Sequence, residues 1–211
     1  MTHTLHRRGT ADNLAHDFVV HSMPARGFNH IDAKPGLQGF LETARRHNPV
    51  NLGDGKRGNQ FSLDYEDMHE HLATITHAVF TNEDDLADVL LELKEQDLGM
   101  SITASGLFDK LFACCTKAGI TPHAMEHSLG VLGNTSKLLE EEISQLTTMC
   151  GHAMVSQGLV RRLIRKIKTG EITPEEAGIE LAKPCQCGIF NPVRAAELIA
   201  EHCALFGVTV K

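Results

Sequence analysis

The sequence predicts an α/β protein, with α+β as the alternative, in which a βαβ-containing half precedes a mostly helical half. Three observations support this. Residues 72–104 have the order strand, helix, strand, and residues 106–211 carry apolar side chains at helical spacing. One Cys/His pair and one Cys/Cys pair in the second half have the spacing of metal ligands. We therefore expect an α/β half over 1–105 and a helical, metal-binding half over 106–211, or one continuous domain.

The first elements of the chain are short. Residues 17–23 (DFVVHSM) predict a strand, and residues 24–35, which contain two prolines, predict a loop. Residues 36–47 (GLQGFLETARRH) predict a helix that ends before an Asn-Pro pair. Residues 51–60 (NLGDGKRGNQ) are polar and rich in glycine, so we expect a loop there.

Residues 72–104 give the clearest topological prediction. Residues 72–80 (LATITHAVF) are rich in types that favour strands, and Thr81 begins a capping-box pattern before leucines at helical spacing. Residues 100–104 (MSITA) predict the next strand. Such a run implies a parallel pair of strands joined by a right-handed crossover.

Helices are predicted through the second half. One apolar face runs from Leu107 to Cys115, and another runs from Leu159 to Ile167 opposite a basic face. Thr173-Pro174-Glu175-Glu176 combines an N-cap residue, a first-turn proline and first-turn acids, and Asn191-Pro192 begins a last helix in the same way.

Composition excludes several classes of protein. The chain has 211 residues, is 42% hydrophobic and carries a net charge of −7, so it is neither disordered nor collagen-like. The negative charge gives no global attraction to nucleic acid or to an anionic membrane, and we expect neither as a partner. The first residues lack the apolar region of a secretory signal, and we expect a soluble, cytoplasmic protein whose six cysteines stay reduced.

Two short segments predict a metal site. Cys150 and His152 flank one glycine, and Cys185 and Cys187 flank one glutamine. Two ligands from each of two loops can close a tetrahedral site. Both pairs are predicted at or just before helix N-termini, where the partial positive charge favours thiolates. The predicted metal ligands are therefore Cys150, His152, Cys185 and Cys187.

The four predicted ligands could hold either an iron–sulfur cluster or a zinc ion. Zinc pairs are more often C-x₂-C than C-x-C, and thiolates near helix ends and glycines suit an iron–sulfur cluster equally well. We favour the cluster and keep zinc as the alternative. Two alternatives to a metal site are that these cysteines form a reactive thiol pair or that they are inert buried residues. Cys203 shares a helical face with apolar residues and is predicted to lie in the core.

Two basic loops predict a site for a small anionic molecule. Arg7 and Arg8, together with Lys56 and Arg57, adjoin glycines and could hold a phosphate or carboxylate as cofactor-binding residues. We expect an enzyme that acts on this small anionic molecule, with an open metal position as the Lewis acid and lyase-type chemistry. A closed metal site would instead indicate a sensor or carrier of the metal or cluster.

A second metal motif competes with the first. His123, Glu126 and His127 match H-x-x-E-H, in which two histidines on one helix face bind zinc and the glutamate is the general base. Thr121-Pro122 predicts a helix start just ahead of it. This motif would make the protein a zinc hydrolase.

Overall fold

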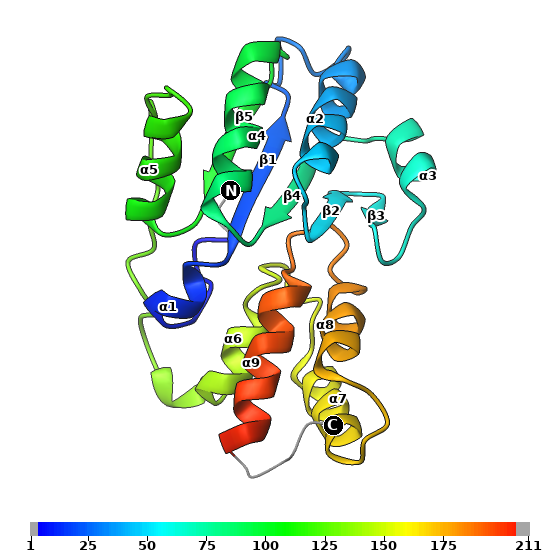
Figure 1. Ribbon diagram of the computed structural model, residues 1–211, viewed down its shortest axis with the longest axis vertical. Helices are drawn as coiled ribbons and strands as arrows, with labels where there is room; N and C mark the ends of the chain where they lie inside the picture. Colours follow the sequence, from blue (N-terminus) through cyan, green and yellow to red (C-terminus); the bar gives the residue numbers. More distant parts are fainter. Residues whose placement is uncertain (1–3, 206–211) are drawn as a thin grey trace.

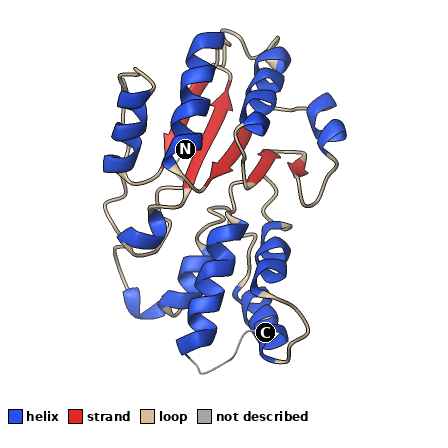
Figure 2. Ribbon diagram, viewed as in Figure 1, coloured by secondary structure: helices blue, strands red, loops and turns tan. Residues whose placement is uncertain are grey.

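One sheet organises the first half of the molecule. The computed structural model describes residues 4–205, and its strands and helices are shown in Figures 1 and 2. The strands that it describes are β1 (Phe18–Met23), β2 (Asn51–Asp54), β3 (Gly58–Asn59), β4 (Thr76–Phe80) and β5 (Ser101–Ser105). They lie in the order β3-β2-β4-β1-β5, and each hydrogen-bonded pair is antiparallel.

Helices fill the rest of the described chain. They are α1 (Ala11–Leu14), α2 (Lys34–Arg46), α3 (Tyr65–Glu70), α4 (Glu83–Gln96), α5 (Phe108–Lys117), α6 (Glu141–Thr147), α7 (Gln157–Lys168), α8 (Pro174–Ala182) and α9 (Pro192–Leu205), with a 3₁₀ turn at Thr135–Lys137. In Figure 1, α2 and α4 lie in front of the sheet and α6–α9 lie below it. No helix in the described part of the chain is long and apolar enough to cross a membrane.

The predicted parallel pair is wrong. β4 and β5 run in the same direction and α4 joins them, but β1 lies between them and pairs antiparallel with both. In the same way, β4 lies between β1 and β2. Two interleaved split β-α-β units of this kind form the arrangement of ferredoxin-like folds. The architecture is therefore α+β, the alternative that the sequence left open.

Alternation along β1 and β4 divides the sheet into two faces. Phe18, Val20 and Phe80 are fully buried and pack with apolar residues of α2 and α4. Val19 and Val79 point to the opposite face and pack with the apolar residues of α6–α9. Because each side chain that leaves water contributes about 1.5–3 kcal/mol, burial of both sets stabilises the contact of the sheet with the helices of both halves.

Most individual elements agree with their predictions. The strands predicted at 17–23, 72–80 and 100–104 correspond to β1, β4 and β5, and the helix predicted at 36–47 corresponds to α2. α8 has the predicted capping box at Thr173. The predicted cap of α4 is wrong by one residue, because the side chain of Asn82, not Thr81, accepts the N–H of Asp85.

The polar segment 51–60 is a β-hairpin and not a loop. The Asp54 carboxylate accepts the N–H groups of Lys56, Arg57 and Ala73, which fixes the turn between β2 and β3. The segment is polar because its buried side chains bond to backbone groups and not to water. A four-residue strand followed by a two-residue strand is too short to show an alternating pattern.

The helix predicted after residue 106 belongs to the sheet half by its packing. α5 packs on α4, and the Sγ of Cys114 lies 3.4 Å from the carbonyl oxygen of Glu83. The sequence predicts that Cys115 lies on the buried face of this helix. In the structure Cys114 is buried and Cys115 is half-buried, so the buried face is centred one residue earlier. Burial raises the pKa of the Cys114 thiol to about 11, which keeps this cysteine protonated and unreactive.

Candidate functional site

Three cysteines from two loops meet where the sheet half joins the helical half. Cys150 follows α6, while Cys185 and Cys187 lie between α8 and α9. The thiol of Cys185 has hydrogen-bonding interactions with those of Cys150 and Cys187. We call these three residues the thiol cluster. Their side chains are at most 2% exposed, so water has little access to the sulfurs.

His152 lies at the edge of the thiol cluster. Its Nδ1 is 3.5 Å from the Sγ of Cys187, and the residue is exposed. The structure thus brings together all four residues that the sequence predicts as metal ligands. The predicted placement of Cys150 and His152 at a helix start is wrong, because α7 begins at Gln157 with Ser156 as its N-cap. They lie in the loop between α6 and α7.

The side chains of the thiol cluster interact with one another and not with a common centre. Within residues 4–205, no three His, Cys, Asp or Glu side chains are positioned to hold a metal ion as they stand. All six cysteines are free thiols. Metal binding would require the cluster to lose protons and its side chains to turn toward one point.

Backbone N–H groups of the two loops lower the pKa of each thiol in the cluster, because an N–H donor favours the anion. They belong to Met154 and His152 for Cys150, to Phe190 for Cys185, and to Ile189 and Cys187 itself for Cys187. Hydrogen bonds to sulfur also stabilise metal-bound thiolates. These donors therefore favour negative charge on the three sulfurs, although other contacts oppose it at Cys150 and Cys185.

The three thiols differ in acidity. Hydrogen bonding from Cys185 lowers the pKa of Cys187 below its ordinary value, and this effect outweighs burial. The interaction of Cys150 with Cys185, together with burial, raises the pKa of Cys150. For Cys185, the bond with Cys150 lowers the pKa, but the bond with Cys187 and burial outweigh it and raise the value to about 12. Cys187 is therefore the first of the three to ionise.

Asparagine side chains of the β2–β3 hairpin hold the Cys185–Cys187 loop. The Asn59 Nδ2 donates to the carbonyl oxygens of Ala182, at 3.0 Å, and Cys185, at 2.8 Å. The Asn51 Nδ2 donates to the carbonyl oxygen of Phe190 at 2.8 Å. Both asparagines are fully buried, so their bonds to this loop are shielded from water. Sequence reasoning missed them because it assigned this hairpin to a surface loop.

The backbone of the same loop lies directly on β2. A Cβ atom at Gly53 would lie 2.6 Å from the carbonyl oxygen of Cys187 and 2.7 Å from the Cα of Gly188. Gly188 itself has φ +77°, a conformation that favours glycine. The contact between Gly53 and Gly188 thus sets how closely the cysteine loop approaches the sheet.

We expect Gly53→Ala to destabilise the protein by about 1–3 kcal/mol, because the new Cβ would overlap backbone atoms that cannot rotate away. The matched control is Gly158→Ala in α7, where the nearest atom is 3.9 Å away. Alanine there should be neutral or stabilising by up to about 1 kcal/mol, since glycine is unfavourable in helices. Urea unfolding of both variants measures this difference. Equal stabilities would contradict the close approach.

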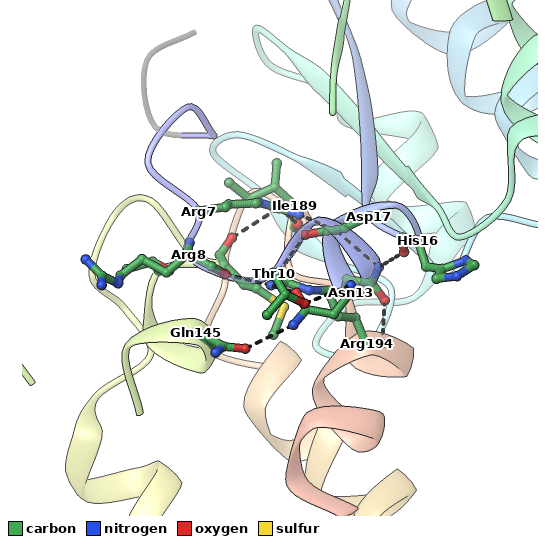
Figure 3. A network of polar contacts seen from close by, with 12 residues as sticks. Arg7, Arg8, Thr10, Asn13, His16, Asp17, Gln145, Ile189 and Arg194 are labelled. Carbon is green, nitrogen blue, oxygen red and sulfur yellow. Dashed lines mark hydrogen bonds and ion pairs between the residues drawn. The ribbon is translucent and has the colours of Figure 1, made fainter. Parts of the chain in front are cut away.

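A buried ion-pair network adjoins the two cysteine loops, and Figure 3 shows its side chains. The Asp17 carboxylate pairs with the guanidinium of Arg7 and, at 2.8 Å, with that of Arg194. The side chains of Asp17 and Arg194 are fully buried, and that of Arg7 is nearly so. Two cations and one anion leave this network with a net charge of +1. Such a charge favours an anionic neighbour.

Arg7 connects the network to both cysteine loops. Its guanidinium donates to the carbonyl oxygens of Met149, at 3.1 Å, and Ile189. Met149 directly precedes Cys150, and Ile189 follows Cys187 by two residues. Arg7 therefore holds the two loops in register. Its predicted role in binding an anionic ligand is not supported by this position, because the side chain is buried and both terminal nitrogens of its guanidinium already bond to Asp17, Met149 and Ile189.

The other basic residues predicted to bind an anion lie in surface contacts. Arg8 pairs with Glu141, and Arg57 lies 3.4 Å from Asp67. Lys56 lies in the hairpin turn, where its carbonyl oxygen accepts a bond from the Gln186 side chain. Nearby carboxylates thus already balance both arginines. Binding of an anion by these residues stays a prediction.

The H-x-x-E-H motif is not on a helix. Residues 121–134 form an exposed loop, so the helix predicted after Pro122 is absent. Gly130 and Gly133 have φ angles of +91° and +92°, which a right-handed helix cannot contain. His123 and His127 therefore lack the shared helix face that a zinc hydrolase of this kind requires.

The fold and the thiol cluster define this protein as an α+β protein with a buried three-cysteine site at the junction of its halves. Comparison of the chain with protein-family models, with curated proteins and with solved structures found no match. Its function must therefore be inferred from the site itself.

Proposed function

We propose that this protein binds an iron–sulfur cluster or a zinc ion through Cys150, Cys185 and Cys187, with His152 as the fourth ligand. The observation that carries the proposal is the meeting of three buried free thiols from two loops, with the Nδ1 of His152 3.5 Å from the Sγ of Cys187. Free thiols also need a reducing compartment, so we propose a cytoplasmic location.

The charge of the surroundings supports the same proposal. Three thiolates with a zinc ion and a neutral histidine carry a net charge of −1, and burial of that charge is costly without a positive partner. The network of Asp17, Arg7 and Arg194 carries a net charge of +1, and Arg7 bonds to carbonyl groups beside both cysteine loops. The positive charge of this network would offset part of the cost of burying such an anionic centre.

The proposed centre is closed, as in a metal or cluster sensor or carrier. Three cysteines and a histidine complete a tetrahedral shell and leave no position for a substrate. Cavities of about 560 and 230 Å³ lie beside β5, and no residue of the thiol cluster lines either. An enzyme with lyase-type chemistry on a small anionic molecule, acting at an open metal position, stays a prediction.

Anaerobic purification followed by metal analysis and absorption spectroscopy tests the proposal. We expect either brown protein with broad visible absorption and bound iron and sulfide, or colourless protein with one zinc per chain. The first result identifies a cluster and the second a zinc ion. Protein that contains neither, and that binds neither after anaerobic reconstitution with iron and sulfide or with zinc, would contradict the proposal.

A further inference from the structure

The two edges of the sheet differ in how they are covered. β3, at one edge, has two residues, both of them buried, and its Asn59 bonds to the Cys185–Cys187 loop. β5, at the other edge, is longer, and within the described chain its backbone is hydrogen-bonded to β1 and to no other segment. Alternate N–H and C=O groups of β5 therefore point away from the sheet and are open to a further strand.

β5 lacks the charges, prolines and bulges that protect exposed edge strands. Its sequence is Ser-Ile-Thr-Ala-Ser, and it pairs with β1 residue by residue over its whole length. Ser101 and Thr103 are exposed, whereas Ile102 and Ala104 pack against the apolar cluster that includes residues of α4. A second extended chain could thus pair with β5 along its full length.

A cavity of about 560 Å³ follows this open edge. Each residue from Ser101 to Gly106 lines it, together with residues of α4, of α5 and of the loop that follows α5. In Figure 1, α5 stands beside β5 at the outer edge of the sheet. The cavity therefore runs along five residues of strand, a length of about 16 Å, and we call it the β5 groove.

Apolar side chains form one wall of the β5 groove. Leu93 comes from α4, and Leu111 and Phe112 come from α5. Phe112 is 42% exposed, so a ligand in the groove would remove apolar surface from water. Ile102 and Ala104 face the same side of the sheet. Residues opposite each other on neighbouring strands have their side chains on the same face, so an added strand would present every second side chain to this wall.

We propose that the β5 groove binds an extended peptide segment of another protein, which adds to β5 as a further strand of the sheet. Its backbone pairs with the outward N–H and C=O groups of β5, and apolar side chains at every second position cover Leu111 and Phe112. In this mode of recognition, main-chain hydrogen bonds give affinity and alternate side chains give specificity. The groove shares no residue with the thiol cluster, so this inference is independent of the proposed function.

Three pentapeptides test the groove: acetylated and amidated Ser-X-Thr-X-Ser, in which X is valine, leucine or phenylalanine. Amide chemical shifts and amide hydrogen exchange are followed during titration. We expect saturable binding of at least one peptide, and exchange of alternate amides in β5 that is at least tenfold slower at saturation. No saturable binding by any peptide would overturn the proposal. Outward amides of β5 that are already protected in the free protein would overturn it too, because the loop after α5 or a second copy of the chain would then occupy the edge.

N-methylated peptides separate strand pairing from apolar contact alone. Successive N–H groups of an extended peptide point to opposite sides, so only one alternate set faces β5. One peptide is methylated at residues of the first set and a second peptide at residues of the other, with the side chains unchanged. We expect their affinities to differ at least tenfold, because only one of the two loses its hydrogen bonds to β5. Equal affinities would contradict strand addition.

Phe112→Ser tests the apolar wall. Loss of the half-exposed ring should weaken binding of the tightest peptide about five- to tenfold, since less apolar surface is covered. The matched control is Phe28→Ser, because Phe28 is 91% exposed and does not line the groove. This control should bind the peptide as the wild type does. The proposal fails if Phe112→Ser binds like the wild type or if the control is weakened equally.

Discussion

Serine at position 185 or 187 is expected to lower the bound metal at least tenfold. A hydroxyl is a far poorer ligand for zinc or iron–sulfur centres than a thiolate, so either change leaves the shell incomplete. Structural zinc contributes roughly 10–16 kcal/mol of apparent binding free energy, and this energy is coupled to folding. The helical half of Cys185→Ser and Cys187→Ser should therefore unfold at much lower urea concentration than that of the wild type.

Cys203→Ser is the matched control for both variants. Cys203 is also fully buried in the helical half, but it lies in α9 within the apolar core, as the sequence predicts. Its replacement should cost about 1–3 kcal/mol, the penalty for a buried hydroxyl, and should leave the metal content unchanged. If the cysteines are inert, all three variants should lose similar stability. Equal metal content in the wild type and in both cluster variants would contradict the proposed function.

Local sequence signals were sufficient to predict most elements but not their order in the sheet. β4, α4 and β5 each have a clear pattern, and all three form where predicted. Whether β1 lies between β4 and β5 depends on contacts such as Phe18 with Phe80, which are far apart in the chain. A strand-helix-strand run has the same appearance whether or not another strand is inserted. For this reason the prediction that β4 and β5 are adjacent parallel strands was wrong.

The candidate site could be predicted only in part for a similar reason. The two cysteine segments are visible because their spacing is local. Their supports are not, because Asn59 lies 126 residues from Cys185 and Arg7 lies 182 residues from Ile189. Buried asparagines and arginines resemble surface residues until the carbonyl groups that they hold are known. Arg7 was therefore predicted as a ligand-binding residue, although it positions the loops.

Asp17→Asn is expected to destabilise the protein by about 3–5 kcal/mol, because it leaves two buried arginines without a counter-charge. Asparagine keeps the size and shape of the side chain, so the loss reflects the missing charge and one missing hydrogen-bond acceptor, and not packing. Arg7 would also be free to turn away from the carbonyl oxygens of Met149 and Ile189, and the two cysteine loops would separate. We therefore expect weaker metal retention under chelator challenge as well as lower stability.

Glu141→Gln is the control for the Asp17 variant. Glu141 pairs with Arg8, but both side chains are partly exposed, and an ion pair of this kind contributes less than about 1 kcal/mol. Urea unfolding of both variants, either both with bound metal or both without it, compares the buried ion pairs of Asp17 with the exposed ion pair of Glu141. Added salt should reduce the small effect of Glu141→Gln and leave the large effect of Asp17→Asn nearly unchanged, because buried charges are poorly screened. If the two variants are equally stable, the network does not anchor the cysteine loops.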